Sequence, residues 1–217
     1  PKPQNPNILK YFYLFLVYIY KIKMQRGGLS IAAALSASWA LNHSQNKTAQ
    51  ADQGKPTFRS GVTLNPHFDK RNEDGEDAYV VRDQFICVTD GVGGWIRKLV
   101  HTGHMTKEYV GHIATLYDNK QYSSLKELLD NASKMTKAQG SSTCVMAELS
   151  DESPNLLKTC NLGDSAYLLV RPVKKDGQVE IEKVFRSKTQ QHRFNAPYQT
   201  GTDKTWPTRA VSATHEI

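Results

Sequence analysis

The stretch Phe85-Ile-Cys-Val-Thr-Asp90-Gly-Val-Gly-Gly-Trp95 is a short apolar run that ends in a carboxylate and continues into a glycine-rich turn. A short apolar run bounded by turn signals predicts a buried strand. Asp90 then stands where that strand ends, and the glycines let the backbone fold closely around it. A carboxylate at the end of a buried strand is costly unless it is paired or binds a cation. The stretch therefore indicates a candidate functional site at Asp90.

A second β-prone run precedes this stretch. Glu76 and Asp77 lead into residues 78–81, and a polar turn at 82–84 leads back into the apolar run. Two such runs joined by a polar turn predict a β-hairpin, so the acids that enter the first strand lie at the same end as Asp90. Convergent carboxylates repel one another, and a hard divalent cation such as Mg²⁺ or Mn²⁺ relieves that repulsion. We therefore expect Glu76, Asp77 and Asp90 to converge at a cation site.

Charge and cysteine content narrow the class of protein. The 217 residues carry a formal net charge of +7, but residues 1–51 hold six Lys or Arg and no Asp or Glu, which leaves 22 basic against 21 acidic residues from Asp52 onward. The body is nearly neutral, so its charge gives no argument for nucleic-acid binding. The length predicts one domain. Cys87, Cys144 and Cys160 lack a Cys-x-x-Cys spacing and predict reduced core thiols in an intracellular compartment.

We interpret residues 1–57 as a targeting segment with a linker, and residues 58–217 as the folded body. Residues 11–20 are apolar, but a helix that spans a bilayer takes about 20 such residues, so we expect no stable membrane span. The chain begins at Pro1 rather than Met, which suggests a fragment or translated upstream sequence; Met24 would serve as a start. From Met24 the sequence is basic, rich in Ser and Ala and free of acids, as in an organelle presequence. A secretory signal peptide with residues 29–41 as its core, or a short membrane anchor, is the alternative.

The rest of the chain predicts two helices and then several strands. Residues 101–114 predict a helix, and Ser124-Leu-Lys-Glu127 has the form of a capping box. The second helix has apolar residues at helical spacing, with Gly140 as its stop; they are Leu125, Leu128, Leu129, Ala132 and Met135. Strands are expected at 140–147, 155–162, 166–170, 179–185 and 209–217, with hairpin turns at 151–155, 163–165 and 176–177 and a loop at 187–210.

Four motifs follow one another along the body: Gly75-Glu76-Asp77-Ala78, Thr89-Asp90-Gly-Val-Gly-Gly-Trp95, Gly140-Ser-Ser-Thr143 and Asn161-Leu-Gly-Asp164-Ser165. Together they resemble the protein phosphatase 2C family, the metal-dependent serine/threonine phosphatases, over residues 58–200. Val-Gly-Gly-Trp95, Asn65-Pro-His67 and Gln190-Gln-His192 resemble that family's mitochondrial branch. The resemblance implies an α+β fold, a four-layer α-β-β-α sandwich with two antiparallel sheets flanked by helices.

The resemblance also implies roles by position. Asp90 resembles the carboxylate that bridges two Mn²⁺ or Mg²⁺ ions, with Gly91 offering its carbonyl oxygen. Glu76 resembles the ligand of the second ion, Asp77 the acid that holds a metal-bound water, and Asp164 the acid of a third, weaker metal site. The implied protein is a serine/threonine phosphatase that hydrolyses phosphomonoesters with water activated by two metals. Its partners are phosphoserine and phosphothreonine proteins, and its location is the mitochondrial matrix, with a cytoplasmic or membrane-anchored location as the alternative.

The chain departs from the family pattern in three places. Val92 stands where many members have His, a candidate general acid. Asn72 stands where the family has a phosphate-binding Arg, so Arg71 and Lys70 become the candidates for binding the substrate phosphate. The family's further aspartate ligands would lie beyond Ile217. We therefore expect a C-terminally incomplete phosphatase or, alternatively, a non-catalytic 2C-like binding or structural subunit with an incomplete metal site.

Overall fold

The computed structural model describes residues 55–64, 75–153, 155–193, 196–202 and 209–217. The described residues from Pro56 onward belong to one compact unit. The expectations for residues 1–54, and for Lys70, Arg71 and Asn72, fall outside the described residues. Within the described ranges, no helix combines the length and the apolar character that crossing a membrane requires.

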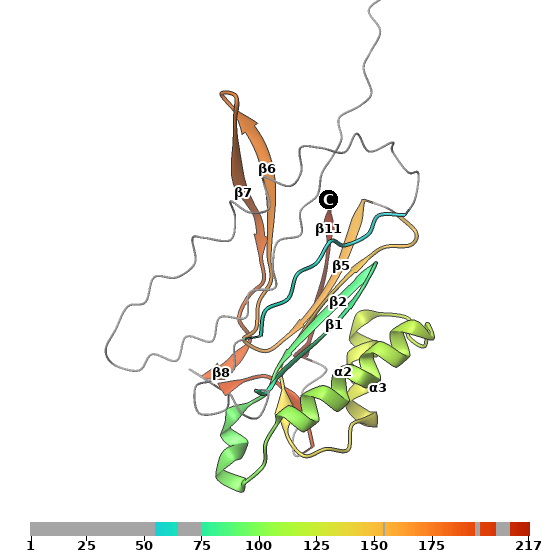
Figure 1. Cartoon of the computed structure of the whole chain (residues 1–217), viewed down its shortest axis with the longest axis vertical. Coiled ribbons are helices and arrows are strands. Elements are labelled where there is room, and N and C mark those ends of the chain that lie inside the picture. The colour runs from blue at the N-terminus through green and yellow to red at the C-terminus, as the bar shows by residue number, and fades with distance from the viewer. Residues whose placement is uncertain (1–54, 65–74, 154, 194–195, 203–208) are drawn as a thin grey trace, which may run out of the picture. The chain divides into compact units, whose positions relative to one another are not determined.

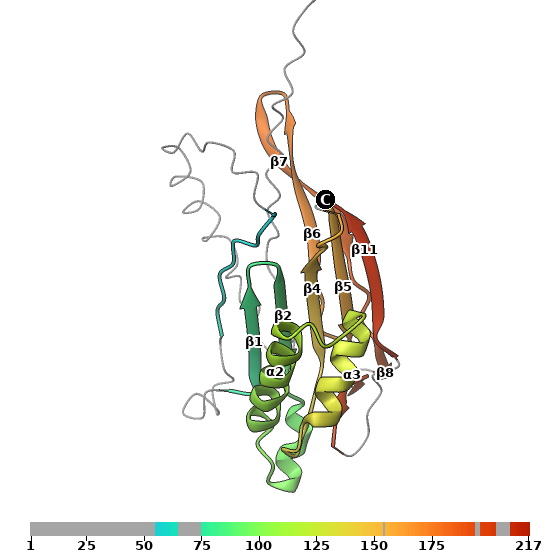
Figure 2. The ribbon, with the colours of Figure 1, turned by 90° about the vertical axis from the view of Figure 1, so that its right-hand side faces the viewer.

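A five-stranded antiparallel sheet carries the predicted hairpin (Figure 1). Its strands lie in the order β1-β2-β4-β5-β11, which can be followed in Figure 2. Their bounds are β1 Asp77–Arg82, β2 Phe85–Asp90, β4 Cys144–Leu149, β5 Leu156–Leu162 and β11 Val211–Glu216. β1 and β2 pair antiparallel around a two-residue turn at Asp83 and Gln84, which confirms the hairpin. The strand expected at the end of the chain is β11, which pairs antiparallel with β5.

Two helices, α2 (Gly103–Asp118) and α3 (Leu125–Met135), pack on one face of this sheet, as Figure 2 shows. α3 begins where the capping box predicted, because Ser124 Oγ accepts the Glu127 N–H at 3.2 Å. The stop predicted at Gly140 is too late, since α3 ends at Met135, and that side chain is 41% exposed rather than part of the core. The core between helices and sheet is apolar; it includes Phe85, Met105, Tyr109, Ile113, Leu128, Leu129 and Met146.

The three cysteines lie inside this core. Cys87, Cys144 and Cys160 are all free and buried, which confirms the expectation of core thiols. Burial raises the pKa of Cys87 well above its ordinary value and raises the pKa of Cys160 to about 12. Both thiols are therefore protonated at neutral pH.

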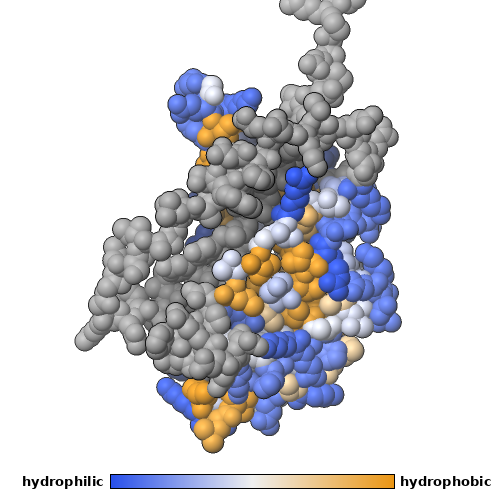
Figure 3. Space-filling view, viewed as in Figure 1, coloured by the Kyte–Doolittle hydropathy of each residue, from blue (hydrophilic) through white to orange (hydrophobic). Residues whose placement is uncertain are grey.

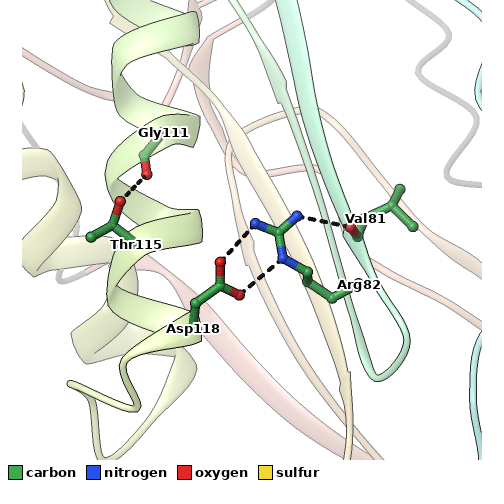
Figure 4. A network of polar contacts seen from close by, with 5 residues as sticks. All are labelled: Val81, Arg82, Gly111, Thr115 and Asp118. Atoms are coloured by element: carbon green, nitrogen blue, oxygen red, sulfur yellow. Dashed lines mark hydrogen bonds and ion pairs between the residues drawn. The ribbon is translucent and has the colours of Figure 1, made fainter.

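An ion pair fastens the turn end of the β1–β2 hairpin to α2 (Figure 4). Arg82 Nε and Nη2 donate to the two carboxylate oxygens of Asp118 at 2.9 and 2.7 Å, and Nη1 donates to the Val81 carbonyl at 3.0 Å. The hydrogen bonds from Arg82 lower the pKa of Asp118 below its ordinary value. This contact holds the hairpin at the end opposite to Asp90.

The remaining strands of the described residues form three two-stranded pairs. β6 (Leu168–Lys175) pairs with β7 (Gln178–Arg186), β8 (Gln191–Arg193) with β9 (Ala196–Pro197), and β10 (Thr200–Gly201) with β3 (Ser141–Ser142). The predicted turn between β6 and β7 is confirmed, since Asp176 and Gly177 have positive φ angles of 51° and 80°.

Two expectations for this part of the chain are wrong. Residues 163–165 do not form a hairpin turn, because β5 and β6 belong to different sheets. The loop expected at 187–210 contains the short strands β8, β9 and β10. The fold is of the expected mixed class, with antiparallel sheets and helices on one sheet face, while the four-layer arrangement stays a prediction.

Candidate active site

The open end of the β1–β2 hairpin brings together the acids that the sequence placed there. Asp77 and Asp90 are direct partners across the ladder. The Gly91 N–H donates to the Glu76 carbonyl at 3.1 Å, so the residue before β1 lies beside the residue after β2. Asp90 is only 6% exposed, and Glu76 and Asp77 are partly buried. The backbone positions of three acidic residues thus lie together at one end of the hairpin.

Two buried threonines at the start of α2 hold Glu76 in place. Thr102 Oγ1 donates to Glu76 Oε1 at 2.9 Å, and Thr106 Oγ1 donates to the Glu76 carbonyl at 2.8 Å. Both threonines are completely buried. The carboxylate is therefore oriented by the protein itself, as a preorganised ligand should be. Sequence reasoning missed both residues, because their contacts join positions 26 and 30 residues apart in the sequence.

Position 91 has no room for a side chain, so this site requires glycine there. A Cβ on Gly91 would lie 2.6 Å from the Glu76 carbonyl oxygen and 2.7 Å from Thr102 Oγ1, closer than real Cβ atoms approach other atoms. Only glycine allows the turn after Asp90 to pack directly against Glu76 and the start of α2.

The short strand β3 holds the main chain of Asp90. The Asp90 carbonyl accepts hydrogen bonds from the Thr143 N–H and from Ser142 Oγ, each at 3.0 Å. Gly91 also forms an isolated antiparallel bridge with Ser142. The Gly-Ser-Ser-Thr motif thus contains the start of a strand, in the range 140–147 where a strand was expected. Thr143 extends the contact, because its hydroxyl lies 2.6 Å from that of Ser165.

Asp164 lies in the partly buried turn that follows β5. The preceding Gly163 has a φ of +105°, and a Cβ there would lie 2.5 Å from Thr143 Cγ2. Gln190 secures the turn, because its N–H donates to the Gly163 carbonyl at 2.8 Å and its side-chain amide donates to the Asn161 carbonyl at 2.9 Å. The contacts of Ser142 and Thr143 therefore connect the Asp164 turn with the Asp90 turn.

The donor atoms at the hairpin end fit a hard divalent cation in type. They are carboxylate oxygens together with the carbonyl oxygen of Gly91, which Mg²⁺ and Mn²⁺ prefer. Among the described residues, no group of three or more His, Cys, Asp or Glu side chains is arranged to hold a metal ion. The assignment of Glu76, Asp90, Gly91 and Asp164 as metal ligands stays a prediction.

The chain is similar to several curated proteins. It is 38% identical over 145 residues to "Probable protein phosphatase 2C 80" of Arabidopsis thaliana, covering 64% of this chain and 32% of that protein. It is 35% identical over 144 residues to "Probable protein phosphatase 2C 55" of the same plant, covering 64% and 28%. It is 31% identical over 141 residues to "Protein phosphatase PTC7 homolog fig" of Drosophila virilis, covering 59% and 42%. The chain thus spans less than half the length of these relatives. No protein-family model matches it.

The fold is also similar to a solved structure. The X-ray structure of the photosystem II phosphatase PBCP superposes with a TM-score of 0.60 at 30% sequence identity, covering 71% of this chain and 60% of that one. These relatives share one class, the protein phosphatases. Within that class the chain is related to the protein phosphatase 2C family, which confirms the resemblance predicted from its motifs.

Proposed function

We propose that this chain is part of a metal-dependent protein serine/threonine phosphatase that hydrolyses phosphomonoesters with water activated by two Mn²⁺ or Mg²⁺ ions. The observation that carries the proposal is that the backbone positions of Glu76, Asp77 and Asp90 lie together at one end of the hairpin. The similarity of sequence and fold to protein phosphatases supports it. Its substrates are then phosphoserine and phosphothreonine proteins.

The chain's own residues have distinct parts in this proposal. Asp90, Glu76 and the Gly91 carbonyl hold the two ions, and Asp164 holds a third. Bound ions supply Lewis-acid activation of water and shield the phosphoryl charge. Asp77, directly across the ladder from Asp90, orients the attacking water by accepting a hydrogen bond from it.

Two of the contacts that orient these groups are with neutral partners. Thr102 fixes the Glu76 carboxylate, and β3 fixes the Asp90 backbone. Neither contact adds a charge that would compete with a cation for the carboxylates. The buried cysteines are poor nucleophiles, since burial raises the pKa of Cys87 and Cys160.

The proposal is tested by hydrolysis of a phosphothreonine peptide by the full-length protein. We expect activity that requires Mn²⁺ or Mg²⁺ and is abolished by EDTA. Asp90→Asn should lower kcat/KM by about two orders of magnitude or more, because several kcal/mol of metal stabilisation is lost. Asp176→Asn is the matched control: Asp176 is exposed in the β6–β7 turn, and Asn tolerates its positive φ. Activity that survives both EDTA and Asp90→Asn would contradict the two-metal proposal.

The same experiment separates the non-catalytic alternative. A 2C-like binding subunit would bind a phosphopeptide, measured by fluorescence anisotropy, without turning it over at any Mn²⁺ concentration.

We further propose a mitochondrial location, supported by the acid-free composition of residues 24–51 and by the similarity to PTC7 homologues. N-terminal sequencing of the mature protein from purified organelles tests it, and a mature start before Met24 would contradict a cleaved presequence.

A further inference from the structure

The segment that follows Asp90 leaves two large apolar side chains on the surface. It forms the 3-10 helix η2 (Gly93–Lys98), which ends at Leu99. Ile96 is 52% exposed and Leu99 is 94% exposed. Figure 3 shows apolar surface at the lower end of the described body, where Figure 1 draws η2 in green. We call Ile96, Arg97 and Leu99 the η2 tip.

Leu99 is unfavourable here in two ways. Its φ of 59° and ψ of 28° are left-handed, and its N–H bonds the Ile96 carbonyl while the Val100 N–H bonds the Trp95 carbonyl. This is the helix-end position that glycine normally occupies, because a Cβ is disfavoured there. The nearly complete exposure of a leucine side chain adds an unfavourable contact with water. An exposed leucine in such a strained position points to a role outside folding.

The η2 tip is nevertheless firmly attached to the candidate site. Trp95 Nε1 donates to Ser141 Oγ at 2.6 Å, and the Val92 N–H donates to the Ser141 carbonyl at 2.9 Å. Lys98 Nζ lies 4.5 Å from the centre of the Trp95 ring. Ser141 belongs to β3, whose next residue, Ser142, donates to the Asp90 carbonyl. One strand therefore positions both the tip and the turn that carries Asp90.

The distance between tip and site matches a short peptide. A 3-10 helix rises about 2 Å per residue, so Leu99 lies roughly 12 Å along the helix from Gly93, where the Asp90 turn ends. An extended peptide advances about 3.3 Å per residue, so about three to five residues cover this distance. A substrate whose phosphoresidue reaches Asp90 can therefore contact Leu99 with a side chain near its own site of dephosphorylation.

The charge around the tip also fits such a substrate. Residues 91–107 contain Arg97, Lys98 and Lys107 and no Asp or Glu. A phosphorylated segment is anionic at its phosphoresidue, and a one-sign cationic surface beside the site attracts it. The combination of apolar and basic side chains favours a partner that offers both an apolar anchor and negative charge.

We propose that the η2 tip is a docking surface for the phosphoprotein substrate itself. The substrate segment is extended and carries a large apolar side chain about three to five residues from the phosphoresidue. That side chain packs on Leu99 and Ile96, while Arg97 faces the anionic part of the segment. The inference rests on the proposed function of the site beside it.

The test compares pairs of phosphothreonine peptides. The two peptides of a pair differ at one position, which holds Leu in one and Ala in the other. That position lies three, four or five residues before or after the phosphothreonine. With the full-length protein and Mn²⁺, we expect kcat/KM to favour Leu over Ala by about tenfold at one position, the value of one apolar contact. Leu99→Gly should bring this ratio close to one. The same substitution relieves the left-handed strain, so its Tm should be equal or higher, and unfolding cannot account for the lost preference.

A matched control separates this contact from general surface hydrophobicity. Ile181→Ser removes an apolar side chain that is 64% exposed on β7, and it should leave the Leu preference unchanged. A preference that Leu99→Gly also leaves unchanged would overturn the docking proposal while hydrolysis itself stands. If the wild-type protein hydrolyses no peptide, the proposed function fails, and anisotropy with the same peptides decides the docking proposal. If there is no peptide preference but the protein self-associates and Leu99→Gly abolishes this, the η2 tip binds a second copy instead. If it binds anionic vesicles and Leu99→Gly abolishes that, the η2 tip binds a membrane instead.

Discussion

Gly91→Ala is the substitution that most directly tests the packing at the acidic hairpin end. The added Cβ would lie 2.6 Å from the Glu76 carbonyl oxygen, 2.7 Å from Thr102 Oγ1 and 2.9 Å from Glu76 Cβ. None of these atoms belongs to the end of a flexible exposed side chain. The backbone oxygen already accepts from the Gly91 N–H at 3.1 Å and from Thr106 Oγ1 at 2.8 Å. Relief of the clash therefore displaces Glu76 and strains these hydrogen bonds.

The magnitude follows from these contacts. Overpacking by one methyl group costs about 1–3 kcal/mol, and each hydrogen bond weakened adds up to about 1 kcal/mol. We expect Gly91→Ala to lower the free energy of unfolding by about 3 kcal/mol, which shifts Tm by roughly 6–12 °C in a domain of this size. Because Glu76 moves relative to Asp90, the Mn²⁺ concentration for half-maximal activity should also rise. Urea unfolding and Mn²⁺ titration of phosphatase activity measure the two effects.

Gly111→Ala provides the matched control. Gly111 lies within α2, and a Cβ there would have no heavy atom within 4 Å. The same substitution should therefore stabilise the protein by about 0.5–1 kcal/mol through helix propensity. The reasoning is refuted if Gly91→Ala is as stable as Gly111→Ala and keeps the wild-type Mn²⁺ dependence.

Two further predictions concern buried polar groups. Thr102→Val keeps the shape of the side chain but removes the hydroxyl that donates to Glu76. We expect the free energy of unfolding in urea to fall by about 2 kcal/mol and the Mn²⁺ concentration for half-maximal activity to rise. An unchanged Mn²⁺ concentration would show that this contact does not position a metal ligand. Burial raises the pKa of Tyr117 from 10.0 to about 12, so the stability linked to this group is fully present below pH 10 and is lost as the pH rises towards 12. Tyr117→Phe should flatten that loss in unfolding curves recorded at several pH values, and an equally steep loss would assign it to other groups.

The sequence predicted those parts of the fold that depend on neighbouring residues. The β1–β2 hairpin follows from two β-prone runs and a short polar turn, and the β6–β7 turn follows from Asp176-Gly177, whose residues adopt positive φ. The start of α3 follows from a capping box of only four residues, Ser124 to Glu127. In each case the interactions that decide the structure lie within one element or one turn.

The features that the sequence did not predict depend on distant residues. Thr102 contacts Glu76 across 26 positions, and no local pattern distinguishes this threonine from one that faces solvent. The sequence at Gly163 looks like a hairpin turn. Glycine is needed there because Thr143 packs against it, and the next strand, β6, belongs to another sheet. Gln190 was noticed only through a family resemblance, although its hydrogen bonds to the turn explain its position.

The strand β3 explains why the candidate site forms one unit although its acids come from distant parts of the chain. Ser141 binds Trp95 of η2, Ser142 and the Thr143 N–H bind the Asp90 carbonyl, and the Thr143 hydroxyl lies beside Ser165. These contacts use hydroxyls and backbone groups and leave the acidic side chains to other partners. Because the same few residues also bond to segments on both sides, we expect a displacement of the Asp90 turn to strain the contacts with the Asp164 turn and with η2. The same short segment therefore contacts both the proposed metal ligands and the proposed docking surface. A phosphatase needs this arrangement if substrate binding at its surface is to place the phosphoryl group at the metals.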